Sequence, residues 1–241
     1  MRVHLAHRKS LINVPLLPAL FLVFCASRLG AAGSTAPLFL PVVTYASGGT
    51  GASSVAVADV NRDGILDLVV ANLCASSTDC SKGSVAVLLG NGDGTFQTAA
   101  TYGSGGQGAT SVAVGDLNGD GKPDLAVANA GSPQVGVLLG NGDGTFQTVQ
   151  RYTSGGSGTS SVAIADVNGD GKLDLAIVNC GTCGLQEAVA GVLLGNGDGT
   201  FEPVRTMPLQ QYYSRSIAVA DVNGDGKPDL VVSFSDRCGI V

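Results

Sequence analysis

A nine-residue acidic segment constrains the fold of this chain more than any other feature, because it occurs four times. The copies span 59–67, 116–124, 166–174 and 221–229. Each has Asp at its first, fifth and ninth positions, Asn at the third and Gly at the sixth. Three carboxylates within one short loop repel one another unless a cation lies among them. One Asp- and Gly-rich segment is usually only a turn, but four copies of one ligand pattern predict four cation sites.

The third copy shows which atoms such a site would use. Calcium binds roughly six to eight oxygen ligands at about 2.3–2.6 Å. Alternate residues of a tight loop can turn their oxygen atoms inward, and Gly171 permits the sharp turn because it lacks a Cβ. The expected donors are four side chains and one main-chain carbonyl, which belong to Asp166, Asn168, Asp170, Asp174 and, for the carbonyl, Lys172.

The distribution of charge narrows the classes of function. The net charge is −6, and 12 of the 17 Asp lie in the four acidic segments. No stretch resembles a basic patch, so nucleic acid is not an expected partner. A glycosidase needs a pair of available carboxylates in one cleft, whereas the only two Glu, Glu187 and Glu202, are isolated in the sequence.

The first 32 residues predict a secretory signal peptide. A positively charged start is followed by the apolar run 11–25 and by small residues that place cleavage after Ala32. The run contains two Pro and is shorter than the roughly 20 residues that span a membrane. A transmembrane anchor and a lipid anchor at Cys25 are the less favoured alternatives. We expect a secreted or cell-surface protein without a stable membrane span, whose mature part, 33–241, contains no His for catalysis or metal binding.

The mature part predicts an all-β fold made of repeats. Short runs rich in Val, Ala and Leu precede and follow each acidic segment, and a third such run follows in three copies. Each third run leads into Gly-Asn-Gly-Asp-Gly-Thr-Phe, a strong hairpin signal, at 90–96, 140–146 and 195–201. We expect Asp93, Asp143 and Asp198 in these segments to form ordinary turns. A fourth strand is expected to start at the Phe of each turn, at Phe96, Phe146 and Phe201.

Four-stranded antiparallel repeats of this length predict the blades of a β-propeller. Residues 39–49 align with 96–106, so the chain is expected to enter on an outer strand, and the last repeat stops after its second strand. The expectation is a partial propeller of about three and a half blades. A fragment, an open arc and a ring closed by another chain are all compatible with this pattern, and open blades would expose strand edges.

The cysteines of the mature part lie at or near the connection between second and third strands. In an exported protein the pairs Cys74–Cys80 and Cys180–Cys183 predict disulfides. The partner of Cys238 would lie beyond Val241. A redox or zinc site at 180–183 is disfavoured, because the mature chain has no His, no second Cys pair of this spacing and no thioredoxin-like pattern.

The acidic segment after a Val-Ala-Val strand resembles the FG-GAP repeat, also called the VCBS repeat, of integrin α-subunit propellers and many secreted bacterial proteins. The resemblance covers about 39–241. It implies calcium at all four segments, bound by Asp59, Asn61, Asp63, Ile65 and Asp67; Asp116, Asn118, Asp120, Lys122 and Asp124; Asp166, Asn168, Asp170, Lys172 and Asp174; and Asp221, Asn223, Asp225, Lys227 and Asp229.

Two details qualify this resemblance. Arg62 replaces the Gly of the other copies, so the first loop is expected to bind calcium with a somewhat different geometry. An EF-hand shares the early ligand spacing but needs Glu at the twelfth position and flanking helices. The twelfth position here is apolar and belongs to a predicted strand in every copy, at Val70, Val127, Ile177 and Val232.

The sequence thus predicts a secreted β-propeller with structural calcium that acts as a non-catalytic binding or adhesion module. The partner would be an extracellular protein or polysaccharide that the sequence does not identify. A carbohydrate-binding accessory portion of a polysaccharide-active enzyme is the alternative, and a lectin is a third possibility.

Overall fold

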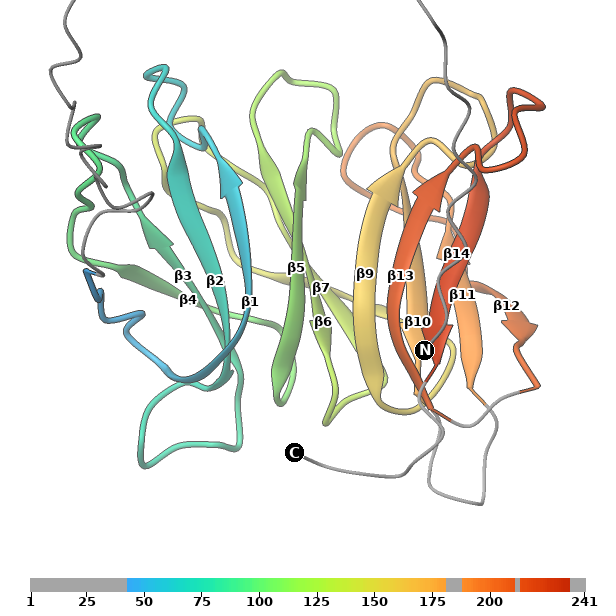
Figure 1. Cartoon of the computed structure of the whole chain (residues 1–241), viewed down its shortest axis with the longest axis horizontal. Coiled ribbons are helices and arrows are strands. Elements are labelled where there is room, and N and C mark those ends of the chain that lie inside the picture. The colour runs from blue at the N-terminus through green and yellow to red at the C-terminus, as the bar shows by residue number, and fades with distance from the viewer. Residues whose placement is uncertain (1–42, 181–187, 211–212, 235–241) are drawn as a thin grey trace, which may run out of the picture. The chain divides into compact units, whose positions relative to one another are not determined.

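The computed structural model describes residues 43–180, 188–210 and 213–234, and every regular element in these ranges is a β-strand. Residues 44 to 241 form one compact unit. Three four-stranded sheets follow one another along the chain, and a two-stranded sheet comes last (Figure 1). The strands are β1 (Thr50–Ala58), β2 (Asp67–Cys74), β3 (Ser84–Leu88), β4 (Ala100–Gly103), β5 (Ala109–Gly115), β6 (Asp124–Asn129), β7 (Gln134–Leu138), β8 (Gln150–Thr153), β9 (Thr159–Ala165), β10 (Asp174–Asn179), β11 (Val189–Leu193), β12 (Arg205–Pro208), β13 (Ser214–Ala220) and β14 (Asp229–Phe234).

Each four-stranded sheet is a blade in which consecutive strands pair antiparallel, in the order of the sequence. The predicted all-β fold of a partial β-propeller is therefore confirmed. The fourth strand begins later than predicted. Phe96 forms only an isolated bridge with Gly90, and β4 itself begins at Ala100. The same bridge forms in the next two blades, between Gly140 and Phe146 and between Gly195 and Phe201.

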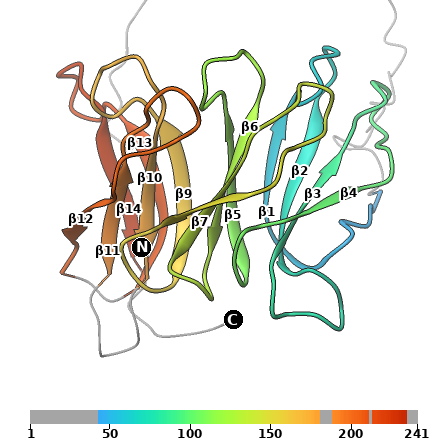
Figure 2. The ribbon, with the colours of Figure 1, turned by 180° about the vertical axis from the view of Figure 1, so that it is seen from behind.

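The hydrophobic core lies between blades and not within any one of them. The innermost strands β1, β5, β9 and β13 are neighbours in that order (Figures 1 and 2). Along an inner strand, side chains point alternately toward the preceding blade and toward the following blade. In β5, Val112 packs in the cluster shared with the first blade, and Ala113 in the cluster shared with the third. This two-sided burial explains why the predicted strands lack a strict alternation of apolar and polar residues.

Polar contacts repeat at every boundary between blades. The hydroxyl of an inner strand donates to a carbonyl of the next inner strand, from Ser53 to Ala109 at 2.7 Å and from Thr110 to Thr159 at 2.9 Å. An edge-to-face aromatic pair also joins the outer strands to the next blade at the first two boundaries, with ring centroids 5.5 and 5.1 Å apart in Tyr102–Phe146 and Tyr152–Phe201, and Tyr45 packs on Phe96 of the first blade in the same way at 5.3 Å. The repeats thus stack through one contact pattern.

An outer strand was expected within 39–49. Residues 39–42 fall outside the described residues, and 43–49 form no strand, although Tyr45 makes the aromatic contact that its aligned residues make. The disulfide Cys74–Cys80 is confirmed and lies in the connection between β2 and β3. Cys183 and Cys238, like the predicted signal peptide, fall outside the described residues, so those predictions stay open. Within the described ranges, no helix has the length and apolar character to span a membrane.

Candidate metal centre

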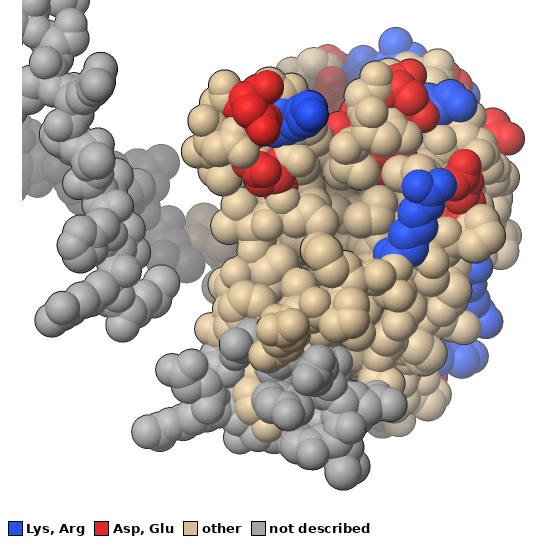
Figure 3. Space-filling model, turned by 90° about the vertical axis from the view of Figure 1, so that its right-hand side faces the viewer, with Lys and Arg blue, Asp and Glu red and all other residues tan. Residues whose placement is uncertain are grey.

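The four acidic segments connect the first and second strands of the four sheets. They lie at the same end of the blades, at the top of Figure 1. Figure 3 shows acidic side chains gathered at this end, with basic side chains directly beside them. The antiparallel pairing of the first two strands places each segment in a tight loop, which the paired ends of those strands hold closed.

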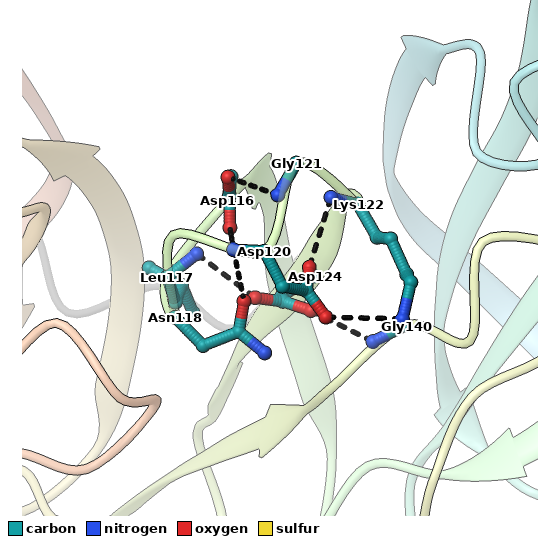
Figure 4. Close-up of polar contacts among 8 residues, drawn as sticks. All are labelled: Asp116, Leu117, Asn118, Asp120, Gly121, Lys122, Asp124 and Gly140. Atoms are coloured by element: carbon teal, nitrogen blue, oxygen red, sulfur yellow. Dashed lines mark hydrogen bonds and ion pairs between the residues drawn. The ribbon is translucent and has the colours of Figure 1, made fainter.

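In the second loop the oxygens of the first and third positions converge on one main-chain amide (Figure 4). The amide of Asp120 donates to Asp116 Oδ1 at 3.1 Å and to Asn118 Oδ1 at 3.0 Å. The amide of Gly121 donates to Asp116 Oδ2 at 2.8 Å. The Asp120 carboxylate accepts the amide of Lys122 at 2.9 Å, and its other oxygen lies 3.2 Å from Lys122 Nζ.

The other loops repeat this arrangement. The fifth-position amide donates to the first-position carboxylate at 3.2, 3.1 and 3.2 Å, in the pairs Asp63–Asp59, Asp170–Asp166 and Asp225–Asp221. The sixth-position Gly has positive φ in every loop, between 78° and 85°. Arg62, which stands where the other copies have Gly, keeps the conformation of the Gly that it replaces, with φ 63° against 73° for Gly119. The first loop therefore retains the geometry of the others at the cost of a left-handed Arg.

The ninth-position Asp has a role that the sequence did not reveal. Asp67, Asp124 and Asp174 are fully buried. In the second loop Asp124 Oδ2 accepts the amide of Leu117 at 2.8 Å, and Asp124 Oδ1 accepts that of Gly140 at 2.7 Å (Figure 4). Gly140 belongs to the turn after the third strand. The carboxylate therefore ties the acidic loop to a second turn of the same blade.

This connection recurs in the first and third blades, where Gly90 donates to Asp67 and Gly195 to Asp174, both at 2.8 Å. In the last sheet the bond among described residues is that from the amide of Val222 to Asp229, at 3.1 Å. A Cβ on Gly140 would collide with the carbonyl oxygen of Pro123. In the sequence, this contact is signalled by the Gly that follows Leu-Leu at the end of the third strand of each blade, because only Gly allows the backbone to approach so closely.

Hydrogen bonding lowers the pKa values of carboxyl groups in these loops, whereas burial raises them. The pKa of Asp166 is lowered, first by the amide of Gly171, and that of Asp221 is lowered first by the amide of Gly226. The amide of Lys122 likewise lowers the pKa of Asp120. Burial raises the pKa of Asp124, against the lowering effect of the two amides that it accepts. The exposed positions thus favour the ionised form that a cation requires.

The donor set of each loop fits a hard cation, because it consists of oxygen atoms alone. The first- and third-position oxygens lie close together because they accept the same amide, and binding one ion would require the same closeness. Among the described residues, however, no group of three or more His, Cys, Asp or Glu side chains lies close enough to hold a metal ion. The ninth carboxylate is directed at two amides. The four predicted calcium sites, including the carbonyls of the seventh positions, therefore stay a prediction.

Acidic residues outside these loops make local contacts. Asp93, Asp143 and Asp198 each accept the amide and the hydroxyl of the Thr two residues later, which is the hydrogen bonding of a turn. Glu202 pairs with Arg205 at 2.7 Å, and Asp79 accepts the hydroxyl of Ser81 at 2.6 Å. The twelfth positions lie in β2, β6, β10 and β14, as expected for a loop that is not an EF-hand.

Repeated four-stranded blades with an acidic loop after each first strand define a propeller-type repeat protein. The sequence model of the FG-GAP-like repeat matches residues 73–127, 116–177 and 185–232, and that of the FG-GAP repeat matches residues 51–88. The chain belongs to the FG-GAP repeat family. No curated protein matches it.

Several solved structures are similar to this chain. One is an Agrocybe aegerita lectin that recognises non-reducing terminal N-acetylglucosamine, with 22% identity, a TM-score of 0.43 and coverage of 74% of this chain and 59% of that chain. The V. cholerae biofilm matrix protein Bap1 has 22% identity, a TM-score of 0.41 and coverage of 78% and 36%. The Photorhabdus luminescens Tc holotoxin pore has 17% identity, a TM-score of 0.36 and coverage of 83% and 11%. The chain spans less than two thirds of each of these proteins.

Proposed function

We propose that this chain is an extracellular, calcium-stabilised binding module without catalytic activity of its own. The observation that carries the proposal is the fourfold repetition of one loop, in which first- and third-position oxygens surround the fifth-position amide. Bound calcium would cancel the repulsion among the carboxylates of each loop. The first, third and fifth side chains would hold the ion, together with the seventh-position carbonyl and the ninth carboxylate.

An extracellular location is supported by the Cys74–Cys80 disulfide, since disulfides persist in oxidising compartments. A non-catalytic role is supported by the contacts of the acidic residues. Of the four acids outside the repeated loops and turns, the structure describes Asp79 and Glu202, and each is bonded to a nearby residue of its own segment. The partner would be an extracellular polysaccharide or protein, bound by the polar loops at the ends of the blades.

A calcium titration tests this proposal. With a dissociation constant of about 10⁻³ M, typical of extracellular modules, a tenfold excess of calcium stabilises by about 1.4 kcal/mol per site. Four sites would add about 6 kcal/mol, which raises the melting temperature by roughly 12–24 °C. Magnesium serves as the control ion, because it tolerates this flexible coordination poorly. A melting temperature that stays unchanged between exhaustive chelation and calcium would refute the calcium sites.

Binding is tested separately on glycan and extracellular-protein arrays, with chelator and with calcium. We expect a ligand whose signal decreases when calcium is removed. Hydrolysis of an arrayed polysaccharide by the purified chain would contradict the non-catalytic role.

A further inference from the structure

The outermost sheets of the described structure expose apolar side chains whose counterparts at the internal boundaries are buried or, in most cases, more covered. Val55 of β1 is 60% exposed, whereas the aligned Val112, Val162 and Ile217 are 7%, 5% and 6% exposed. Val57 and Leu66 lie on the same side and are 58% and 60% exposed. We call these three residues the leading face, because their counterparts face the preceding blade.

The last sheet exposes the opposite face. Val222 is 66% exposed, whereas its counterparts Val60 and Leu117 are each 1% exposed and Val167 is half-buried. Val231 of β14 is 45% exposed, whereas Val69 and Ala126 are fully buried. Ala218 and Ala220 of β13 are exposed on the same side. We call these four residues the trailing face, because their counterparts face the following blade.

The internal boundaries show what covers each face. At the first boundary the leading side of the second blade, with Val112 and Leu125, packs on the trailing side of the first, with Val60 and Val69. The same packing joins the second blade to the third. A trailing face is therefore the surface that covers a leading face, and the described residues include one exposed face of each kind.

The extent of the two faces also matches. Residues 44–49 already contact the outer part of the first blade, where Tyr45 packs on Phe96 and Ser47 donates to Asn72 at 2.6 Å. Ser104 makes the equivalent bond to Asn129 at the next boundary, also at 2.6 Å. Of the described first blade, the inner part with Val55 and Val57 is exposed. The described part of the last sheet consists of the two inner strands β13 and β14, which correspond to this inner part.

Hydrogen-bonding groups at the two faces correspond as well. The amides of Val112, Val162 and Ile217 each donate to a Ser hydroxyl of the preceding inner strand, at 3.4, 3.4 and 3.3 Å. Val55 has the aligned amide on the leading side, and the aligned hydroxyl, Ser216, is exposed on the trailing side. Arg215 is the one departure, since it stands where the complete blades have Ser or Thr, and its guanidinium is also a donor.

We propose that two copies of this chain associate head to tail, with β13–β14 of one copy packed on β1–β2 of the other in the geometry of an internal blade boundary. The interface is heterologous, because each copy contributes a different surface. It buries the leading and trailing faces and pairs Ser216 of one copy with the Val55 amide of the other. The proposal does not depend on calcium or on the proposed function.

The test is the mass of the purified chain in solution, by light scattering and sedimentation over a wide range of concentration. We expect assemblies of two or more chains. The leading-face variant Val55→Lys/Val57→Lys and the trailing-face variant Ala218→Lys/Val231→Lys should each be monomeric. All four positions are exposed, so the variants should fold, as far-UV circular dichroism will show. Leu66→Lys and Val222→Lys replace any double variant that does not fold.

A mixture of the two variants makes the test specific. Each variant keeps one intact face, so an equimolar mixture should form a dimer of two chains and nothing larger. The control Gln147→Lys/Thr148→Lys adds the same charge on an exposed turn away from both faces and should assemble like the unmodified chain. A monomeric unmodified chain, assemblies that both variants leave intact, or a mixture that stays monomeric would each overturn the proposal.

Discussion

Replacing Asp124 by Asn separates the two roles that the ninth position of an acidic loop can have, which are to accept main-chain amides and to bind calcium. Asn keeps the shape of Asp but has one acceptor oxygen, whereas Asp124 accepts two amides, from Leu117 and Gly140. One of these buried N–H groups would lose its acceptor and face the Asn NH₂ group. An unsatisfied buried donor costs about 1–3 kcal/mol.

For a unit of this size, that loss corresponds to a decrease in melting temperature of roughly 2–12 °C. The assay is thermal unfolding in excess chelator and again in calcium. Because the two amides belong to the protein, the loss should be present in chelator. Asp120→Asn should cost more in calcium than in chelator, since its exposed carboxylate would act mainly on the ion.

Asp229→Asn is the matched control, because the bond that the structure describes for Asp229, from the amide of Val222, is exposed. We expect a smaller loss there than for Asp124→Asn. If Asp124→Asn melts like the unmodified chain in chelator, the connection between the two turns contributes nothing and the reasoning is wrong. A loss that appears only in calcium would assign the carboxylate to the ion alone.

Three further predictions concern single features of the fold. Arg62→Gly should stabilise the chain by about 0.5–1 kcal/mol, because the left-handed conformation costs an L-residue about 1–2 kcal/mol and Gly offsets part of this gain through its larger loss of entropy on folding. The reverse change, Gly119→Arg in the second loop, should lower the melting temperature. Equal melting temperatures for the two variants and the unmodified chain would contradict the argument. Cys74→Ser/Cys80→Ser should lower stability by about 2 kcal/mol, the loop-closure term for a ring of this size, and reductant should have the same effect on the unmodified chain. The hydroxyl and then the amide of Thr145 lower the pKa of Asp143, so this group stabilises the fold above its unfolded pKa of about 3.9, and its contribution is lost as the pH falls through the lower folded pKa. Asp143→Asn should therefore reduce the difference in melting temperature between neutral and acidic pH, and an unchanged pH profile would count against it.

The repeats themselves could be predicted from the sequence because their causes are local. An acidic loop with Gly at its sixth position, the flanking β-branched runs and the Asn-Gly turns each specify their conformation within about ten residues. The four-stranded blades and the Cys74–Cys80 pairing follow from the same short spacings. The start of the fourth strand was predicted too early, since residues 97–99 after the Phe96 bridge form no strand and β4 begins only at Ala100.

Only the tertiary structure decided which residues share an environment. Asp124 and Asp120 look alike in the sequence, yet one is buried against Gly140, which lies 16 residues further along the chain, and the other is exposed. Val55 and Val112 occupy the same place in the same motif, but one is exposed and the other buried. The motif specifies the strand and the side on which each side chain lies. Whether that side is buried depends on a neighbouring blade, and contacts between blades are made by residues far apart in the chain.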